Sequence, residues 1–470
     1  MWKIRKILIV KNIPNSPEAR DAASLIHPLT NLKDHLEKGP VVIDRGQGVW
    51  VHDVHGKSYI EGMSGLWCVS LGFSQERLVE AASRQMRQLP YYHLTNHKSH
   101  PPVIELAEKL LEIAPVPMSK IWFSNSGSEG NDSAVRIAWY YWHAMGQPER
   151  RKLISHQRSY HGNTIVSASL SGMFYNHASF GLPLEGFLHV TPPHHYRYAM
   201  PGESEEKFST RLANELEELI LAEGPHTIAA FFTEPIMGSG GVIVPPDSYF
   251  SRIKAVLDRY DILLVADEVI TGFGRTGNMF GTTTMGLYPD MIVCAKGLSS
   301  AYIPISALMI NEKIFSNIME ESDRVGIFGL SFTYSGHPVS TAVALETLAI
   351  YEENDLMSHV RAVSPIFQNG LGALRGHPLV GEVRGCGLLA GVELVANAET
   401  GEAFNASAEI GTYCNSRAEE HGLIVRAIGD TISFCPPLII SAEEIEEMIS
   451  RFTRALDDTL DYARSAGLTE

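Results

Sequence analysis

Length, composition and charge limit the classes to which this protein can belong. The chain has 470 residues, of which 44% are hydrophobic and 20% charged, and its formal net charge is −16 at pH 7. This ordinary globular composition excludes fibrous and disordered classes, and the length allows two or three domains. Because the chain is acidic and has neither a basic tract nor an apolar run of membrane-spanning length, we expect no nucleic-acid and no membrane partner.

The cysteines and the first residues bear on location. The five cysteines are far apart and form no CxxC pair, so neither a zinc ribbon nor a redox pair is predicted. A reducing, cytoplasmic location fits this pattern best. The first ten residues faintly resemble a signal peptide, but Lys11 interrupts an apolar stretch that is too short, so we expect an N-terminal extension instead.

The first predicted elements are a small antiparallel unit and a helix. Two apolar runs at residues 41–43 and 49–51 are separated by Gly46 and Gly48, which predicts paired strands. Residues 103–113 place leucines on one face and predict a helix.

A long alternation of strands and helices follows. Helical patterns such as 214–221 and 249–260 separate several short apolar runs. Strands that alternate with helices predict an α/β fold with a mostly parallel central sheet and helices on both faces. The runs expected to form strands are residues 121–123, 153–155, 228–233, 262–266 and 291–295.

The end of the chain predicts a smaller α+β domain. Residues 380–395 alternate and carry glycines, which indicates paired strands, and 423–425 and 432–434 indicate two more. Ser441 and Glu444 then form a capping box before an amphipathic helix. We expect residues 71–335 to form the large domain and 336–470 the small one, with the N-terminal segment 1–70 joining the small domain.

Three of the apolar runs end in charged side chains. Asp267 and Glu268 follow one run, Lys296 follows the next, and Glu234 follows an earlier one. Ligands of open parallel sheets bind beyond the carboxyl ends of the strands, so these groups are expected near one small ligand. Singly, each would more often be a solvated strand end, and a structural ion pair would produce the same pattern.

A polar turn adds a candidate phosphate site. Residues 123–129 combine a strand end, small polar residues and the start of a helix. Backbone amides and hydroxyls at a helix N-terminus bind phosphate well. The alternative is an ordinary N-cap provided by Ser126 or Ser128.

Two other motifs do not indicate a binding site. Residues 272–277 match GxGxxG after a strand, but their continuation is a poor helix, so nicotinamide binding is not expected and the glycines predict a tight loop instead. The histidines at 93, 97 and 100 and at 194–195 lack the spacing of known zinc motifs. We therefore expect no metal site.

Together these residues resemble a known family. The runs 264–277 and 295–298 are similar to the signature of class III aminotransferases, which are fold type I pyridoxal-phosphate enzymes. The resemblance continues through Ser126–Glu129, Tyr160–Gly162, Glu234–Pro235 and Phe332–Pro338, and so covers nearly the whole chain in order. Residues 65–68 and 426–430 resemble in particular the ω-transaminases that use pyruvate as the amine acceptor.

The resemblance implies roles at the cofactor. Lys296 would hold pyridoxal 5'-phosphate as a Schiff base and move the proton, while Asp267 would keep the pyridine nitrogen protonated. Tyr160 would stack on the ring, and Glu234 would lie behind it. Further contacts to the cofactor are implied for Ser126, Gly127, Ser128, His161, Val269, Phe332 and, from a partner subunit, Thr333.

The resemblance also implies a substrate pocket. Trp67 would line it, although the bare sequence favours a core residue, and Arg426 would bind the carboxylate of the keto acid. Leu29 stands where this subgroup often has phenylalanine, and Ser331 stands where glycine is common. Both departures leave the substrate preference open.

The implied function is transfer of an amino group from a primary amine or ω-amino acid to pyruvate by a ping-pong mechanism. The implied assembly is a homodimer or homotetramer with active sites at the interface. A same-fold aminomutase, racemase or decarboxylase would use Lys296 and Asp267 equally well. A protein that binds the cofactor without catalysis is a third possibility, disfavoured by the intact lysine.

Overall fold

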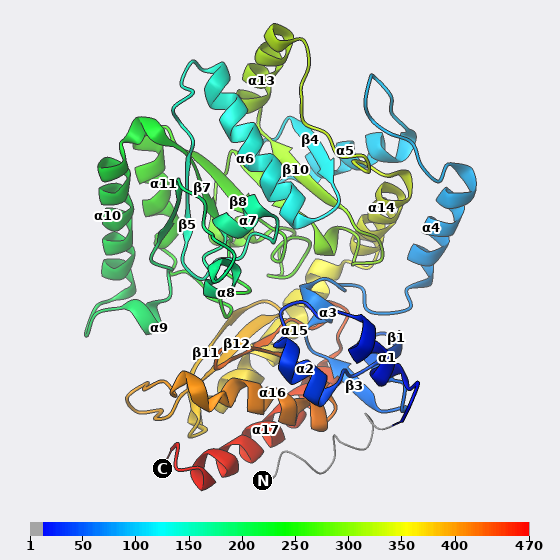
Figure 1. The fold of residues 1–470 in the computed structure, drawn as a ribbon, viewed down its shortest axis with the longest axis vertical. Helices are drawn as coiled ribbons and strands as arrows, with labels where there is room; N and C mark the ends of the chain where they lie inside the picture. The colour runs from blue at the N-terminus through cyan, green and yellow to red at the C-terminus, as the bar shows by residue number, and fades with distance from the viewer. Residues whose placement is uncertain (1–12, 470) are drawn as a thin grey trace.

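A seven-stranded sheet lies at the centre of the larger part of this computed structural model, which describes residues 13–469 (Figure 1). The strand order is β4-β10-β9-β8-β7-β5-β6. The strands from β9 to β6 run parallel, whereas β10 is antiparallel to both of its neighbours. The bounds are β4 Lys120–Ser124, β5 Lys152–His156, β6 Phe187–Val190, β7 Ile228–Thr233, β8 Leu263–Asp267, β9 Met291–Cys294 and β10 Ser306–Ile310.

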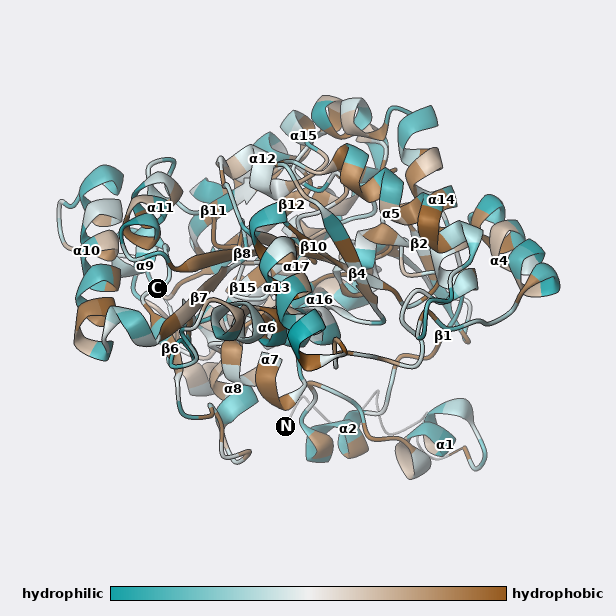
Figure 2. Cartoon of the chain, turned by 90° about the horizontal axis from the view of Figure 1, so that it is seen from above, coloured by the Kyte–Doolittle hydropathy of each residue, from teal (hydrophilic) through white to brown (hydrophobic). Residues whose placement is uncertain are grey.

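The central strands β7, β8, β9 and β10 are buried on both faces because they are apolar except at an end position, such as Thr233, Asp267 or Ser306. Phe231 and Phe232, adjacent in β7, belong to separate buried clusters on opposite sides of the sheet, as the alternation of side chains along a strand requires. Figure 2 shows β7, β8 and β10 as hydrophobic strands in the middle of the molecule. One face is covered by α6 (Gly127–Ala144) and α13 (Glu312–Val325), the other by α5 (Pro101–Ile113), α10 (Glu205–Glu223), α11 (Tyr249–Arg259) and α14 (Pro338–Glu353).

The smaller part of the molecule joins both ends of the chain. A four-stranded antiparallel sheet has the order β11-β12-β15-β14, with β11 Val380–Cys386, β12 Leu389–Leu394, β14 Arg426–Ile428 and β15 Thr431–Phe434. A second sheet combines β1 Ile43–Gln47, β2 Trp50–Asp53 and β3 Ser58–Glu61 with β13 Leu423–Ile424. In it, β3 pairs in parallel with β13, so N-terminal and C-terminal elements lie side by side (Figure 1).

Three helices pack on this part: α15 Leu356–Gly372, α16 Ile410–Glu420 and α17 Ala442–Ser465. The predicted capping box of α17 is present, since Ser441 accepts from the Glu444 backbone and the Glu444 side chain accepts from the Ser441 backbone. The remaining helices are short except for α4: α1 Pro17–Ser24, α2 Leu32–Lys38, α3 Ser64–Trp67, α4 Glu76–Gln88, α7 Ile165–Leu170, α8 Phe174–His177, α9 His195–Tyr198 and α12 Gly281–Met285.

The predicted fold class is confirmed. All five apolar runs form strands of the large sheet, and β6 and β10 are additional strands that the pattern did not single out. The stretch after the GxGxxG motif is less irregular than expected, because residues 281–285 form α12. Within residues 13–469, no helix is long and apolar enough to cross a membrane. The N-terminal stretch that resembles a signal peptide lies outside the described residues, and the domain boundaries stay predictions.

Candidate active site

The three charged residues predicted at strand ends are brought to one edge of the sheet. Asp267 is the last residue of β8 and pairs with Val293 of the neighbouring β9, which Lys296 follows. Glu234 follows Thr233, the last residue of β7, the neighbour of β8 on the other side. Because these three strands are adjacent and parallel, their carboxyl ends bring the Lys296 amine and two carboxylates to one edge, with Asp267 on the middle strand.

Lys296 has an unusual backbone conformation and a buried side-chain amine. Its φ of +46° lies in the left-handed region, which a non-glycine residue adopts only when the surrounding structure enforces it. Burial lowers the pKa of the Lys296 amine, while nearby groups including Cys68 and Asp267 oppose that shift. Among residues 13–469, no hydrogen bond or ion pair engages its Nζ. A lysine with a lowered pKa and a free amine is suited to act as a nucleophile or a base.

Asp267 is fixed by three donors. Its Oδ2 accepts hydrogen bonds from Nδ2 of Asn131 at 2.8 Å and lies 2.9 Å from Nδ1 of His161. Its Oδ1 accepts from the backbone N–H of Val269 at 3.0 Å. The side chain is only 4% exposed. A carboxylate anchored this firmly presents one fixed negative charge to whatever lies beside it.

Asn131 is a functional candidate that the sequence did not reveal. It lies one turn inside α6, and besides Asp267 it donates to the backbone carbonyl of His161 at 2.7 Å. It thereby joins the helix, the loop after β5 and the end of β8. Its spacing of four residues from Gly127 is the only sequence hint, since that spacing places both on the same face of α6.

The first turn of α6 forms a close-packed cradle. Ser126 is the N-cap and accepts from the backbone N–H of Glu129, which confirms the alternative assignment for that residue. Ser128 Oγ accepts from the backbone N–H of Asn163 at 3.1 Å and keeps its own proton free to donate. A Cβ on Gly127 would come within 3.0 Å of Val269. Only a residue without a side chain therefore leaves room at this helix end.

Gly162 is required for the same cradle. Its φ is +136°, and a Cβ there would meet the hydroxyls of Ser128 and Ser167, both at 2.5 Å. The backbone of the loop after β5 can therefore approach the start of α6 closely only with glycine at this position. The approach places His161 and Tyr160 beside the helix terminus.

Glu234 holds the loop that carries Tyr160. Its Oε1 accepts from the backbone N–H of Tyr160 and its Oε2 from that of Gly238, both at 3.0 Å. Burial raises the pKa of Glu234 to about 7, with Asp267 adding to the rise and His161 opposing it. Burial also raises the pKa of Tyr160, and the positive charge of Arg426 opposes that shift. Tyr160, Glu234, Asp267 and Arg426 thus form one electrostatic group.

Trp67 and Arg426 border this group from the smaller part of the molecule. Trp67 is 2% exposed, packs with Met63 and Ile236, and has a buried indole N–H without a partner among the described residues. Arg426 is the first residue of β14, is partly buried, and makes no side-chain hydrogen bond within residues 13–469. An unpaired guanidinium near the site is available to an anionic ligand.

For three predicted site residues, no hydrogen bond to this group is found within residues 13–469. Leu29 is 52% exposed and belongs to none of the buried apolar clusters of residues 13–469. Phe332 is partly buried, and Thr333 is exposed, with its backbone carbonyl accepting from Tyr91. The role predicted for Thr333 required a partner subunit, and the roles of all three stay predictions.

The GxGxxG segment forms a tight loop beside Lys296, with Gly274 at φ +103° and Gly277 at φ +89°. A Cβ on Gly297 would lie 3.3 Å from that of Phe273, so this loop packs directly against the lysine turn. Arg275 of the loop is buried and donates to the carbonyls of Leu388 and Pro436. The loop therefore links the site to the smaller part of the molecule.

The residues present fit a phosphorylated aldehyde cofactor. The glycine-dependent cradle at the N-terminus of α6 suits a phosphate, the free amine of Lys296 suits an aldehyde carbon, and the anchored Asp267 suits a protonated ring nitrogen. The donor set contains these three chemically different groups within one site.

Comparisons with known proteins agree with this chemistry. The family model described as "Aminotransferase class-III" matches residues 33–456. "Gamma aminobutyrate transaminase 3, chloroplastic" of Solanum lycopersicum is 49% identical over 93% of this chain and 84% of its own length. "Vanillin aminotransferase" of Capsicum chinense is 46% identical over 89% of this chain and 92% of its own length.

Solved structures are similar as well. The ω-transaminase from Pseudomonas jessenii in complex with PMP has a TM-score of 0.94 and 54% identity, covering 95% of this chain and 99% of that one. Another structure, described as "Transaminase with L-ala", has a TM-score of 0.88 and 56% identity over 90% of this chain and 99% of that chain. The chain therefore belongs to the class III aminotransferases and is a pyridoxal-phosphate-dependent transaminase.

Proposed function

We propose that this transaminase moves the amino group of a primary amine or ω-amino acid to pyruvate by a ping-pong mechanism. The observation that carries the proposal is the unpaired guanidinium of Arg426, which lies close enough to affect the pKa of Tyr160, in the same site as Lys296 and Asp267. The relatives support it, because their names include γ-aminobutyrate, vanillin and ω-transaminases. Alanine, present in the name of one similar structure, is the amino acid that pyruvate yields.

The bound cofactor supplies an electron sink that makes the proton on the amine-bearing carbon removable. Lys296 is the group that takes and returns this proton, because burial lowers the pKa of its amine and so favours the neutral form that a base requires. Asp267 keeps its negative charge in place through Asn131, His161 and the Val269 backbone. The chain thus holds a base and a counter-charge at fixed positions on neighbouring strands.

Arg426 allows the site to accept two kinds of substrate. A carboxylate fits the fork of the guanidinium with two parallel hydrogen bonds, so a keto acid is bound through this residue. An amine donor without a carboxylate makes no use of it and relies on apolar surroundings such as Trp67. Two half-reactions with chemically different substrates in one pocket require a ping-pong order.

The experiment uses the holoenzyme and separates the half-reactions. A panel of amine donors, with and without a carboxylate, is added in the absence of a keto acid, and conversion of the bound cofactor to its amine form is followed by absorbance. Pyruvate is added afterwards, and alanine is measured as the product. The proposal expects both steps, each with one equivalent per site.

The outcomes also separate the alternatives. Failure of every donor to convert the cofactor would refute amine transfer. Conversion followed by return with 2-oxoglutarate but not with pyruvate would overturn the acceptor. A racemase, aminomutase or decarboxylase would consume its substrate without forming alanine from pyruvate.

The assembly belongs to the same proposal. Since Thr333 and Leu29 are exposed within one chain, both are available to the site of a second copy, and we propose a homodimer or homotetramer in which they complete the pocket of that copy. Cytoplasmic location stays a prediction, and the names of some plant relatives include the chloroplast or the mitochondrion. Sedimentation of the holoenzyme tests the assembly, and a monomer that retains full turnover would refute the shared site.

A further inference from the structure

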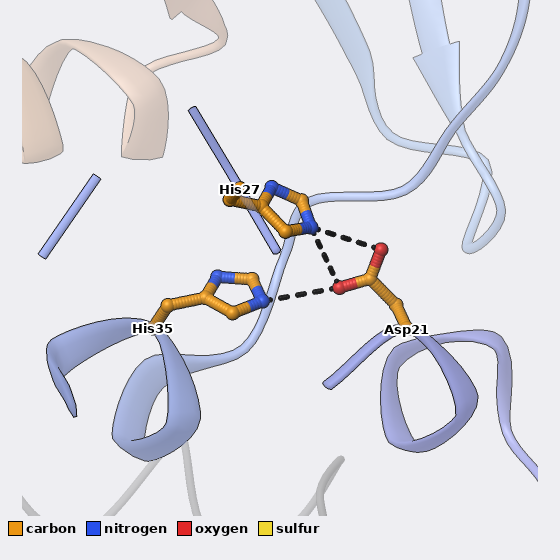
Figure 3. A group of neighbouring side chains, drawn as sticks. All are labelled: Asp21, His27 and His35. Atoms are coloured by element: carbon orange, nitrogen blue, oxygen red, sulfur yellow. Dashed lines mark hydrogen bonds and ion pairs between the residues drawn. The ribbon is translucent and has the colours of Figure 1, made fainter. Parts of the chain in front are cut away.

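Asp21, His27 and His35 form a cluster outside the active site, near the N-terminal end of the described chain (Figure 3). Asp21 lies on α1, His35 on α2, and His27 on the loop between them. The two histidine rings are stacked with centroids 4.0 Å apart, and both direct Nε2 at the Asp21 carboxylate. The side chains are 15%, 30% and 8% exposed for Asp21, His27 and His35, so the cluster is shielded but reachable.

The ligand atoms already have the spacing of a metal site. Nε2 of His27 lies 2.9 and 3.0 Å from the two oxygens of Asp21, and Nε2 of His35 lies 3.1 Å from Oδ1. All three ligand atoms lie within 4.8 Å of one another. Two ligands about 2.1 Å from a metal ion are roughly 3.0–3.4 Å apart, and the separation of each histidine nitrogen from the Asp21 carboxylate is within a few tenths of an ångström of that range.

The chemistry of the set favours one class of ion. Two imidazole nitrogens and one carboxylate oxygen suit Zn²⁺ and its transition-metal neighbours, whereas Mg²⁺ and Ca²⁺ prefer oxygen ligands alone. Within residues 13–469 no lysine or arginine pairs with Asp21. A cation would therefore find a carboxylate that no lysine or arginine of the described chain compensates, beside two imidazole nitrogens.

A second cluster in the chain shows the contrast. His194, Glu382 and Glu393 also lie within ligand distance of one another, but Arg384 donates to both carboxylates and Arg197 pairs with Glu393. The guanidinium groups of Arg384 and Arg197 already neutralise these carboxylates, so a metal cation is not needed there. Among residues 13–469, no guanidinium or ammonium group occupies the N-terminal cluster in this way.

We propose that Asp21, His27 and His35 bind one divalent transition-metal ion of the Zn²⁺ class, with water completing the coordination. The ion ties α1, the loop of residues 25–31 and α2 together. The expectation of no metal site rested on the histidines at 93, 97, 100 and 194–195. The separations of 6 and 8 residues between the ligands proposed here also match no zinc motif, so spacing does not reveal them. The folding of two short helices against each other brings the ligands together instead. None of the three ligands is a residue that the proposed function uses, although Leu29, which that function assigns to the pocket of a second copy, lies in the loop tied by the ion.

Binding is measured on the tag-free holoenzyme by equilibrium dialysis against ZnCl₂ buffered with a competing chelator. We expect one tight equivalent per chain that MgCl₂ does not displace. His27→Asn and His35→Asn should each weaken this binding at least as much as loss of an outer-shell partner does, about 10- to 100-fold. His97→Asn, which removes an exposed histidine elsewhere, is the matched control and should bind like the wild type.

Proteolysis gives a second measurement that does not depend on activity. If the ion ties the segment together, trypsin cleavage after Arg20 and Lys33 requires release of the ion. Zn²⁺ at 100 times the wild-type dissociation constant should then slow these cleavages about 100-fold in the wild type and in His97→Asn, but only about 2- to 11-fold in His27→Asn. Absence of a tight equivalent, equal Zn²⁺ binding by all variants, or cleavage unaffected by Zn²⁺ would each overturn the proposal.

Discussion

The anchoring of Asp267 by Asn131 leads to the sharpest prediction about the active site. In Asn131→Ala, Asp267 loses the 2.8 Å hydrogen bond from Nδ2, and the carbonyl of His161 loses its 2.7 Å bond from the same group. Asn131 is only 1% exposed, so water does not replace the lost donor freely. The carboxylate then keeps His161 and the Val269 backbone but gains freedom to rotate.

The expected magnitude follows from the type of bond. A hydrogen bond to a charged group contributes about 1.5–3 kcal/mol and a neutral one about 0.5–1.5 kcal/mol, so the free energy of unfolding should fall by about 2–4.5 kcal/mol. The hydrogen bond to Asp267 is the one that stabilises the counter-charge. If its loss raises the activation free energy of proton removal, at about 1.4 kcal/mol for each tenfold change in rate, that step slows about 10- to 100-fold.

The assay is single-turnover conversion of the bound cofactor with an excess of amine donor, after saturation with pyridoxal phosphate. The matched control is Asn311→Ala, which removes a similar bond, 2.9 Å from Nδ2 to Asp290, and the N-cap bond of α13. That variant should lose comparable stability while its half-reaction keeps the wild-type rate.

The comparison separates positioning from folding. If Asn131→Ala converts the cofactor within twofold of the wild-type rate, or if Asn311→Ala slows the reaction equally, the reasoning on Asp267 is wrong. Substitution of Asn131 by Asp offers a further check, because a second carboxylate beside Asp267 should slow the reaction more than alanine does.

Three more predictions follow from the site and its surroundings. Lys296→Ala should abolish the absorbance band of the covalently held cofactor and turnover together, and surviving turnover would refute its role. Arg426→Ala should weaken turnover of the keto acid about 10- to 150-fold, because a charge-assisted hydrogen-bonded pair with the carboxylate is lost. The half-reaction of an uncharged amine should keep its rate, and equal losses in both half-reactions would exclude the carboxylate role. Burial raises the pKa of Glu61 to about 7, so the fold favours its protonated form, and this contribution is lost as the pH rises from about 4.5 through 7. In Glu61→Gln the fall in unfolding free energy between pH 5 and pH 7, measured by urea unfolding, should shrink by about 2 kcal/mol, and an unchanged slope would contradict the assignment.

Strand ends were the most predictable part of this molecule. Fully apolar runs followed by Glu234, Asp267 and Lys296 predicted which residues meet at the edge of the sheet, because parallel strands share that edge. The strand β10 was missed, since its run from 306 to 310 lies soon after β9 and returns antiparallel without an intervening helix.

Contacts between distant elements were not predictable. The meeting of Asn131, His161 and Asp267 depends on how α6 is rotated about its axis and on how closely Gly162 lets a loop approach. Neither quantity is encoded in a local pattern. The roles of Leu29 and Thr333 depend on a surface that a second chain would supply, and no periodicity within one chain contains that information.

The parallel pair of β3 and β13 has a consequence for the synthesis of this chain. Ile60 and Leu423, which face each other in that pair, are 363 residues apart. At about 5–20 residues per second, a ribosome needs roughly 20–70 s to make the second strand after the first. Throughout that interval one side of β3 has no neighbour, so the edge of a nascent hairpin is open to foreign strands, and chaperones that cover such edges would act on this protein before its last hundred residues exist.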